Sequence, residues 1–112
     1  MKVYIQEEEG YVVIRAEGRL DTNTALDFER ECAPCIAGEN KKMILDFSKL
    51  EYISSAGLRC ILNMAKKLRS EGGSLALCGL RGLVEEVIMI SGFDSFLTIF
   101  EDVDSAIKGG AN

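Results

Sequence analysis

Apolar and polar residues follow one another along the chain in short runs that predict alternating strands and helices. Two strand-like runs, VYI at 3–5 and YVVIRA at 11–16, are separated by QEEEG, whose Gly10 suits a tight hairpin turn. Three further strands are expected at 41–47, 74–80 and 96–100. Each of the first two holds a continuous apolar core, which is typical of strands covered on both faces of a sheet.

Helical periodicity fills the segments between these strands. The first helix follows Asp21, Thr22 and Asn23, any of which can serve as its N-cap, and Pro34 and Gly38 should end or kink it. The other helices are expected to start at Ser54 and Ser55, to lie within 82–93 with a stop at Gly92, and to lie within 101–110. The order β-β-α-β-α-β-α-β-α predicts an α/β fold, a mixed sheet of about five strands with four helices packed on it.

Length and composition narrow the class of protein. The chain has 112 residues, so we expect a single domain spanning 1–112. It has no apolar stretch near the ~18 residues that span a bilayer and no signal-peptide pattern at its start, so we expect a cytoplasmic protein with no membrane partner. A net charge of −5 argues against nucleic acid as a partner. Because the chain has no histidine, the commonest general base and metal ligand is missing, and we expect neither an enzyme nor a metal site.

The segment YISSAGLRCIL at 52–62 places two serines between a buried strand and a helix. Open α/β sheets usually carry their sites at this edge, and the free N–H groups and positive end of a helix favour an anion there. Serine is also among the best N-caps, worth ~1 kcal/mol. The residues alone therefore leave two roles open, a structural cap or a serine that another protein modifies. A phosphate would add a charge of about −1.5 to −2 at the helix start.

The helix after the serines is predicted to have an apolar face and a basic face. The apolar face comprises Leu58, Ile61, Leu62, Ala65 and Leu68, and the basic side carries Arg59, Asn63, Lys66 and Lys67. The basic side is either a solvated surface or a contact for an acidic partner. Gly57 leaves room for the close approach of another backbone.

The four cysteines include a Cys-x-x-Cys pair, Cys32 and Cys35, near the end of the first predicted helix. Reactive pairs lie at helix N-termini, whereas this position and the neighbouring Glu29 and Glu31 should raise the thiol pKa. Zinc would need two more ligands, and Cys60 and Cys78 belong to other elements. We therefore expect small buried thiols, although a redox enzyme is a further alternative. A nucleotide-hydrolysing domain is disfavoured because no Gly-rich phosphate loop with lysine is present.

The segments GRLDTNTA and MILDFSKLEYISSAGLRCIL together resemble the STAS domain family, specifically the small bacterial anti-sigma factor antagonists. The resemblance covers nearly the whole chain and implies a STAS-type fold. It also implies partner switching: an anti-sigma factor that is itself a serine kinase phosphorylates one serine at this helix start, and a PP2C-type phosphatase reverses the change. The unmodified antagonist binds the anti-sigma factor and so frees the sigma factor.

Carried over onto this chain, the resemblance places the phosphorylated serine at Ser55 and an acidic position near it at Asp21. Two departures are visible, because Ser54 stands where well-known members carry aspartate and Ala56 where they carry a second hydroxyl residue. The expected partner-binding residues are Asp21, Ser54, Ser55, Gly57, Arg59, Asn63 and Lys66. No cofactor is implied. STAS domains also serve anion transporters and lipid-trafficking complexes, so a free-standing accessory subunit without phosphorylation is the alternative.

Overall fold

The computed structural model describes residues 1–110 of the chain; residues 111 and 112 of the expected domain lie outside them. Its strands are β1 (Lys2–Glu8), β2 (Tyr11–Leu20), β3 (Lys42–Ile53), β4 (Ser74–Cys78) and β5 (Thr98–Phe100). Its helices are α1 (Ala25–Ala37), α2 (Ser55–Ser70), α3 (Gly82–Ile90) and α4 (Val103–Lys108), with a 3-10 turn, η1 (Phe93–Ser95), before β5. The predicted order of elements is confirmed.

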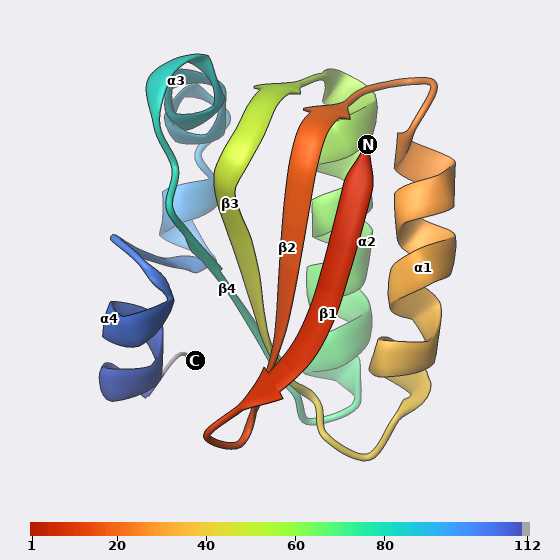
Figure 1. Ribbon diagram of the computed structural model, residues 1–112, viewed down its shortest axis with the longest axis vertical. Coiled ribbons are helices and arrows are strands. Elements are labelled where there is room, and N and C mark those ends of the chain that lie inside the picture. Colours follow the sequence, from red (N-terminus) through yellow and green to blue (C-terminus); the bar gives the residue numbers. More distant parts are fainter. Residues whose placement is uncertain (111–112) are drawn as a thin grey trace.

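The strands form one mixed sheet in the order β1-β2-β3-β4-β5. β1 and β2 are antiparallel and are joined by the tight turn that Gly10 predicted. Both residues of this turn, Glu9 and Gly10, have positive φ. β2 to β5 run parallel, so their carboxyl ends meet at one edge of the sheet. Figure 1 shows α1 and α2 on one face of the sheet and α4 on the other, with α3 beside the carboxyl end of β3. The mixed α/β sheet with four helices is therefore confirmed for the described residues.

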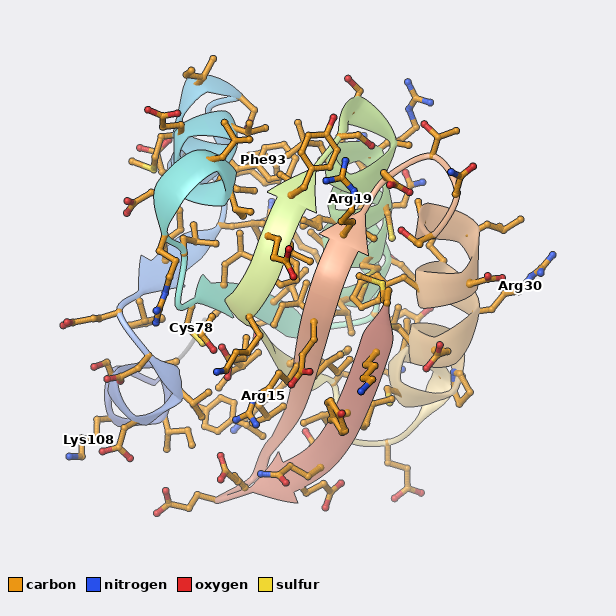
Figure 2. The ribbon with its side chains drawn as sticks, turned by 45° about the horizontal axis from the view of Figure 1, so that its top comes forward. Arg15, Arg19, Arg30, Cys78, Phe93 and Lys108 are labelled. Atoms are coloured by element: carbon orange, nitrogen blue, oxygen red, sulfur yellow. The ribbon has the colours of Figure 1, made fainter. Side chains whose placement is uncertain are left out.

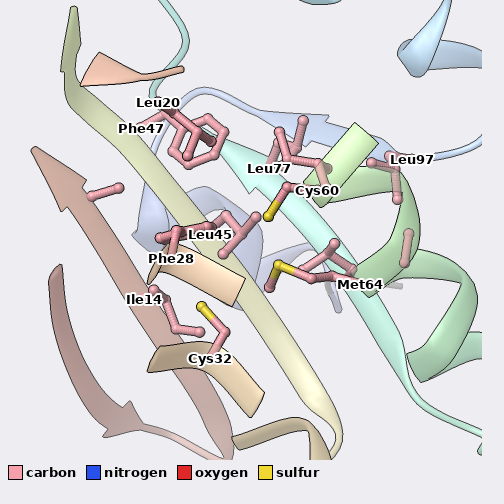
Figure 3. Packing of buried hydrophobic residues seen from close by; sticks show 14 of the residues in the cluster. Ile14, Leu20, Phe28, Cys32, Leu45, Phe47, Cys60, Met64, Leu77 and Leu97 are labelled. Carbon is pink, nitrogen blue, oxygen red and sulfur yellow. The ribbon is translucent and has the colours of Figure 1, made fainter. Parts of the chain in front are cut away.

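Two buried clusters explain why the middle strands are apolar without alternation. The larger cluster lies between the sheet and α1 and α2, and Figure 3 shows Phe28, Leu45 and Phe47 within it. The smaller cluster lies under α4 and includes Ile44 and Ala76. Successive residues of β3 therefore face two different cores, as expected for a strand covered on both faces.

Several boundaries differ from the predicted ones. β3 continues past residue 47 to Ile53, because β2 extends to Leu20 and the two strands pair along this whole length. Helix α1 contains Pro34 and ends only at Ala37, before Gly38. Pro34 has no N–H to donate to the carbonyl four residues earlier in the helix. Because Pro34 lies in the exposed last turn, that carbonyl can form a hydrogen bond with water instead. Gly92, with φ 80°, stops the third helix as predicted.

The end of β2 and the end of β3 set the position of the site. Leu20 and Ile53 are paired in the parallel register, so the residues that follow each strand leave the sheet side by side. Both α1 and α2 begin just beyond this edge, at the top of Figure 1. Within residues 1–110, no helix is long and apolar enough to cross a membrane.

Candidate functional site

Ser54 is the N-cap of α2. Its backbone is extended, its N–H donates a 3.0 Å hydrogen bond to the carbonyl oxygen of Leu20, and its hydroxyl oxygen accepts a 3.4 Å hydrogen bond from the N–H of Gly57. The capping role that the sequence left open for the two serines therefore belongs to Ser54.

Ser55 is the exposed first residue of this 16-residue helix. Within the described part of the chain its hydroxyl makes no hydrogen bond, and the N–H groups of Ser55 and Ala56 have no acceptor. Unpaired N–H groups at the positive end of a helix favour a nearby negative charge. The geometry leaves the Ser55 hydroxyl free for chemistry and gives it an environment that favours an anion.

Gly57 is buried, and its role is packing. A Cβ atom at this position would come within 2.8 Å of the Leu20 carbonyl oxygen and of Cγ1 of Ile53. The backbone that approaches Gly57 is therefore that of Leu20 in the same chain. The lack of a side chain lets α2 start close to the sheet and leaves Gly57 with little exposed surface, and its contact with a partner stays a prediction.

Asp21 lies beside the start of α2, directly after Leu20. Its Oδ1 accepts hydrogen bonds from the N–H of Asn23 at 2.9 Å and from the Thr24 hydroxyl at 3.3 Å. Burial raises the pKa of Asp21, but these hydrogen bonds and the Arg19 guanidinium at 3.6 Å outweigh it and hold the pKa below its usual value. Asp21 is therefore a carboxylate at neutral pH, held in place by the turn.

The N-cap of α1 differs from the three residues predicted for it. The position is occupied by Thr24, whose hydroxyl donates to the Arg19 carbonyl and accepts from the Asp21 N–H. Asp21 stabilises the turn before the helix, because its side chain accepts hydrogen bonds from Asn23 and Thr24, which precede the first residue of α1.

Arg19 and Tyr52 form a pair at this edge that the sequence analysis did not single out. They are partners in the β2–β3 register, and the Arg19 guanidinium lies 4.2 Å from the centre of the Tyr52 ring. Figure 2 shows Arg19 at the end of β2. Its Nε lies 3.6 Å from the carboxylate of Asp21. Only knowledge of the register could have brought these two residues together.

One exposed line of residues runs along α2 from the free serine. We call it the α2 stripe; its members are Ser55, Arg59, Asn63 and Lys66. Arg59 and Lys66 make no ion pair within residues 1–110, whereas Lys67 pairs with Glu71 at 3.2 Å. The predicted exposure of the basic side is confirmed, but the Lys67 ammonium is paired with Glu71, the C-cap residue of the same helix.

The buried face of α2 is rotated relative to the predicted one. It comprises Gly57, Cys60, Ile61, Met64, Ala65 and Leu68. Leu58 and Leu62 are only half-buried. The reason is that α2 packs against α1 as well as against the sheet: the Cys60 thiol lies 3.8 Å from the carbonyl oxygen of Ala25, the first residue of α1.

The cysteines are packing residues. Burial, with smaller contributions from Cys35, Glu31 and Glu29, raises the pKa of the Cys32 thiol to about 12. Burial also raises the pKa of Cys35, which is half-buried. The predicted direction is thus confirmed, with burial rather than the neighbouring glutamates as the main cause. Across residues 1–110, no three Cys, Asp or Glu side chains form a group that could hold a metal ion.

Comparison with known proteins identifies the family. The sequence model of the STAS domain matches residues 2–106. The chain belongs to the STAS domain family. One relative, "Putative anti-sigma factor antagonist BtrV" of Bordetella bronchiseptica, is 36% identical over 106 residues that cover 95% of this chain and 91% of the relative. The "Anti-sigma F factor antagonist" of Paenibacillus polymyxa is 22% identical over 96% of this chain and 92% of its own.

Solved structures agree on the fold. The crystal structure described as "a putative anti-sigma factor antagonist (tm1081)" from Thermotoga maritima superposes with a TM-score of 0.90 at 23% identity, covering 96% of this chain and 92% of its own. The structure of the anti-sigma factor antagonist SpoIIAA in its unphosphorylated form superposes with a TM-score of 0.74 at 18% identity, covering 96% of both chains. The STAS-type fold expected from the sequence is confirmed.

Proposed function

We propose that this protein is a cytoplasmic anti-sigma factor antagonist that binds an anti-sigma factor serine kinase until that kinase phosphorylates Ser55. The observation that carries the proposal is the division of roles between the two serines. Ser54 caps the helix, while Ser55 is exposed, and within residues 1–110 its hydroxyl makes no hydrogen bond and two N–H groups beside it have no acceptor. A kinase could therefore modify Ser55 without removing a bond that the fold needs.

The physical effect of the phosphate differs between the free protein and the complex. In the free protein, a charge of about −1.5 to −2 at the helix start is favourable by ~0.3–1 kcal/mol. Arg59, one turn along the α2 stripe, offers a cation on the same face. In the complex the same charge would lose its water, which costs several kcal/mol if no partner cation replaces it. A loss of only 1.4 kcal/mol weakens binding tenfold.

The proposed partner surface consists of exposed and half-buried residues around Ser55. Asp21 and Ser54 stand beside it because β2 and β3 end together, and Arg59, Asn63 and Lys66 continue it along α2. It combines one fixed carboxylate with two cations that make no ion pair in the described part of the chain, which suits a partner with complementary charges. The exposed position of Ser55 also leaves a phosphoserine open to a PP2C-type phosphatase. The role is one of binding, with catalysis supplied by the partners.

The test uses Ser55→Ala, Ser55→Asp and, as the matched control, Ser54→Ala as baits in lysate of the native host. We expect Ser55→Ala to retain a protein with a serine-kinase domain and Ser55→Asp to lose it by at least tenfold. Ser54→Ala removes one contact of the proposed surface but adds no charge, so it should weaken retention by much less than Ser55→Asp does. Incubation of the wild-type protein with that kinase and ATP, followed by peptide mapping, should place phosphate on Ser55.

Two outcomes would contradict the proposal. One is phosphate mapped to Ser54 instead of Ser55; the other is full binding by protein that is stoichiometrically phosphorylated on Ser55. Recovery of a transporter or lipid-trafficking subunit, with no kinase, would favour the accessory-subunit alternative.

A further inference from the structure

Strand β1 presents a long free edge. It is the outermost strand of the sheet, and its seven residues pair with β2 in an unbroken register from Lys2↔Glu17 to Glu8↔Tyr11. Within residues 1–110, no strand pairs with the outer side of β1; Figure 1 shows β1 in front, with helix α1 beside it on the side away from β2. Such an edge carries unpaired backbone N–H and C=O groups and is a template for another strand.

β1 has charged residues near its two ends but lacks two other usual protections of an edge strand. It has no proline and no bulge, and two of its central residues are large, apolar and exposed: Tyr4 is 49% exposed and Ile5 43%. By contrast, the strand at the opposite edge, β5, has three residues and is packed against α4. β1 is therefore the edge at which strand addition would bury most apolar surface.

The sequence of β1, KVYIQEE, is complementary to itself in one arrangement. If two copies pair antiparallel about Ile5, then Ile5 faces Ile5, Tyr4 faces Gln6, and Lys2 faces Glu8. A parallel pairing in register would instead place Lys2 against Lys2 and Glu8 against Glu8, and like charges directly opposite each other are destabilising. We propose that β1 pairs antiparallel with β1 of a second copy of this chain, joining the two sheets into one across a two-fold axis at Ile5.

The geometry of this dimer keeps the Ser55 surfaces accessible. In an antiparallel pair the two β1 strands run in opposite directions, so the carboxyl edges of the two sheets point away from each other. Each edge carries one Ser55, so the two serines lie at opposite ends of the dimer. The inference does not depend on the proposed function, since it uses only β1.

The first test is the mass of the protein in solution, measured by light scattering on a sizing column from about 1 to about 300 µM, because pairing through one strand gives a small interface and a weak dimer. We expect the wild-type mass to approach twice 12.3 kDa as the concentration rises. Ile5→Lys, which places two lysines face to face at the axis, should remain monomeric with a cooperative unfolding transition. The control Leu26→Lys, at a 57% exposed position on α1, should dimerise like the wild type.

The second test fixes the register. In a Cys35→Ser background, Ile5→Cys should give a disulfide-linked dimer with oxidised glutathione, because directly opposed residues have Cβ atoms only about 4.5–5.5 Å apart. Glu7→Cys should not, since Glu7 of one copy lies four residues, about 13 Å, from Glu7 of the other. A wild-type protein that stays monomeric throughout, a dimer that survives Ile5→Lys, or equal cross-linking at both positions would overturn the proposal.

Discussion

The backbone N–H of Ser54 donates a 3.0 Å hydrogen bond to the carbonyl oxygen of Leu20. This bond ties the residue after β3 to the last residue of β2, and it continues the parallel pairing in which Leu20 faces Ile53. The start of α2 is thereby fixed next to the turn that holds Asp21. Two segments far apart in the chain form one surface because two strands end at the same level.

Replacing each of the two serines should separate their roles in stability. Ser54→Ala removes the acceptor for the Gly57 N–H, so the free energy of unfolding should fall by about 1 kcal/mol. Ser55→Ala removes an exposed hydroxyl without a hydrogen-bond partner in residues 1–110, so the change should stay within about 0.5 kcal/mol. Urea denaturation followed by circular dichroism measures both, and equal losses would show that Ser54 is not the functional cap.

Reversing charges on the α2 stripe should slow association with the kinase-type partner recovered by the Ser55→Ala bait. Arg59→Glu with Lys66→Glu should reduce the association rate about tenfold at low salt. The deficit should shrink as salt rises, because exposed charges are screened beyond ~8–10 Å at physiological ionic strength. Lys108→Glu, on α4 at the opposite face of the sheet, is the control and should associate at the wild-type rate. A rate that does not change in the double variant would assign the stripe to ordinary solvated surface.

Cysteine reactivity should follow burial. With a thiol-reactive dye at pH 8, Cys35 should react first, since it is the half-buried thiol, and the buried Cys32, Cys60 and Cys78 should react only after denaturation. Burial raises the pKa of the Cys32 thiol to about 12, so this thiol is protonated at that pH. Cys35→Ser should abolish the early phase and leave partner binding unchanged. An early phase that persists in this variant would show that another cysteine is accessible in the folded protein.

Stability at acid pH should depend on Glu71. Hydrogen bonds from Lys41 and then from Lys67 hold the pKa of the Glu71 carboxyl below its usual value of 4.5. Because this pKa is lower in the folded than in the unfolded protein, the stabilisation is present above pH 4.5 and is lost as the pH falls through the folded-state pKa. Glu71→Gln should therefore flatten the decline of the urea midpoint below about pH 4.5. Glu86→Gln, an exposed change on α3, should keep the wild-type pH profile; identical profiles for the two variants would contradict the role of Glu71.

Much of the fold follows from local patterns. The apolar runs of β3 and β4, the glycines that stop helices, and the Ser-Ser-Ala-Gly start of α2 each carry their signal within a few residues. The exposure of Ser55 and of the α2 stripe follows from the helical period once the helix start is known. These features were therefore predictable from the order of amino acids alone.

The pairing of β2 with β3 supplies what local patterns could not. It extends β3 to Ile53, sets Arg19 over Tyr52, and brings the Leu20 carbonyl so close to Gly57 that a side chain there would not fit. Each of these contacts joins residues more than thirty positions apart, across a register that shifts twice between Arg15 and Arg19. A register of this kind is chosen by the packing of both sheet faces together, so no stretch of the chain encodes it on its own.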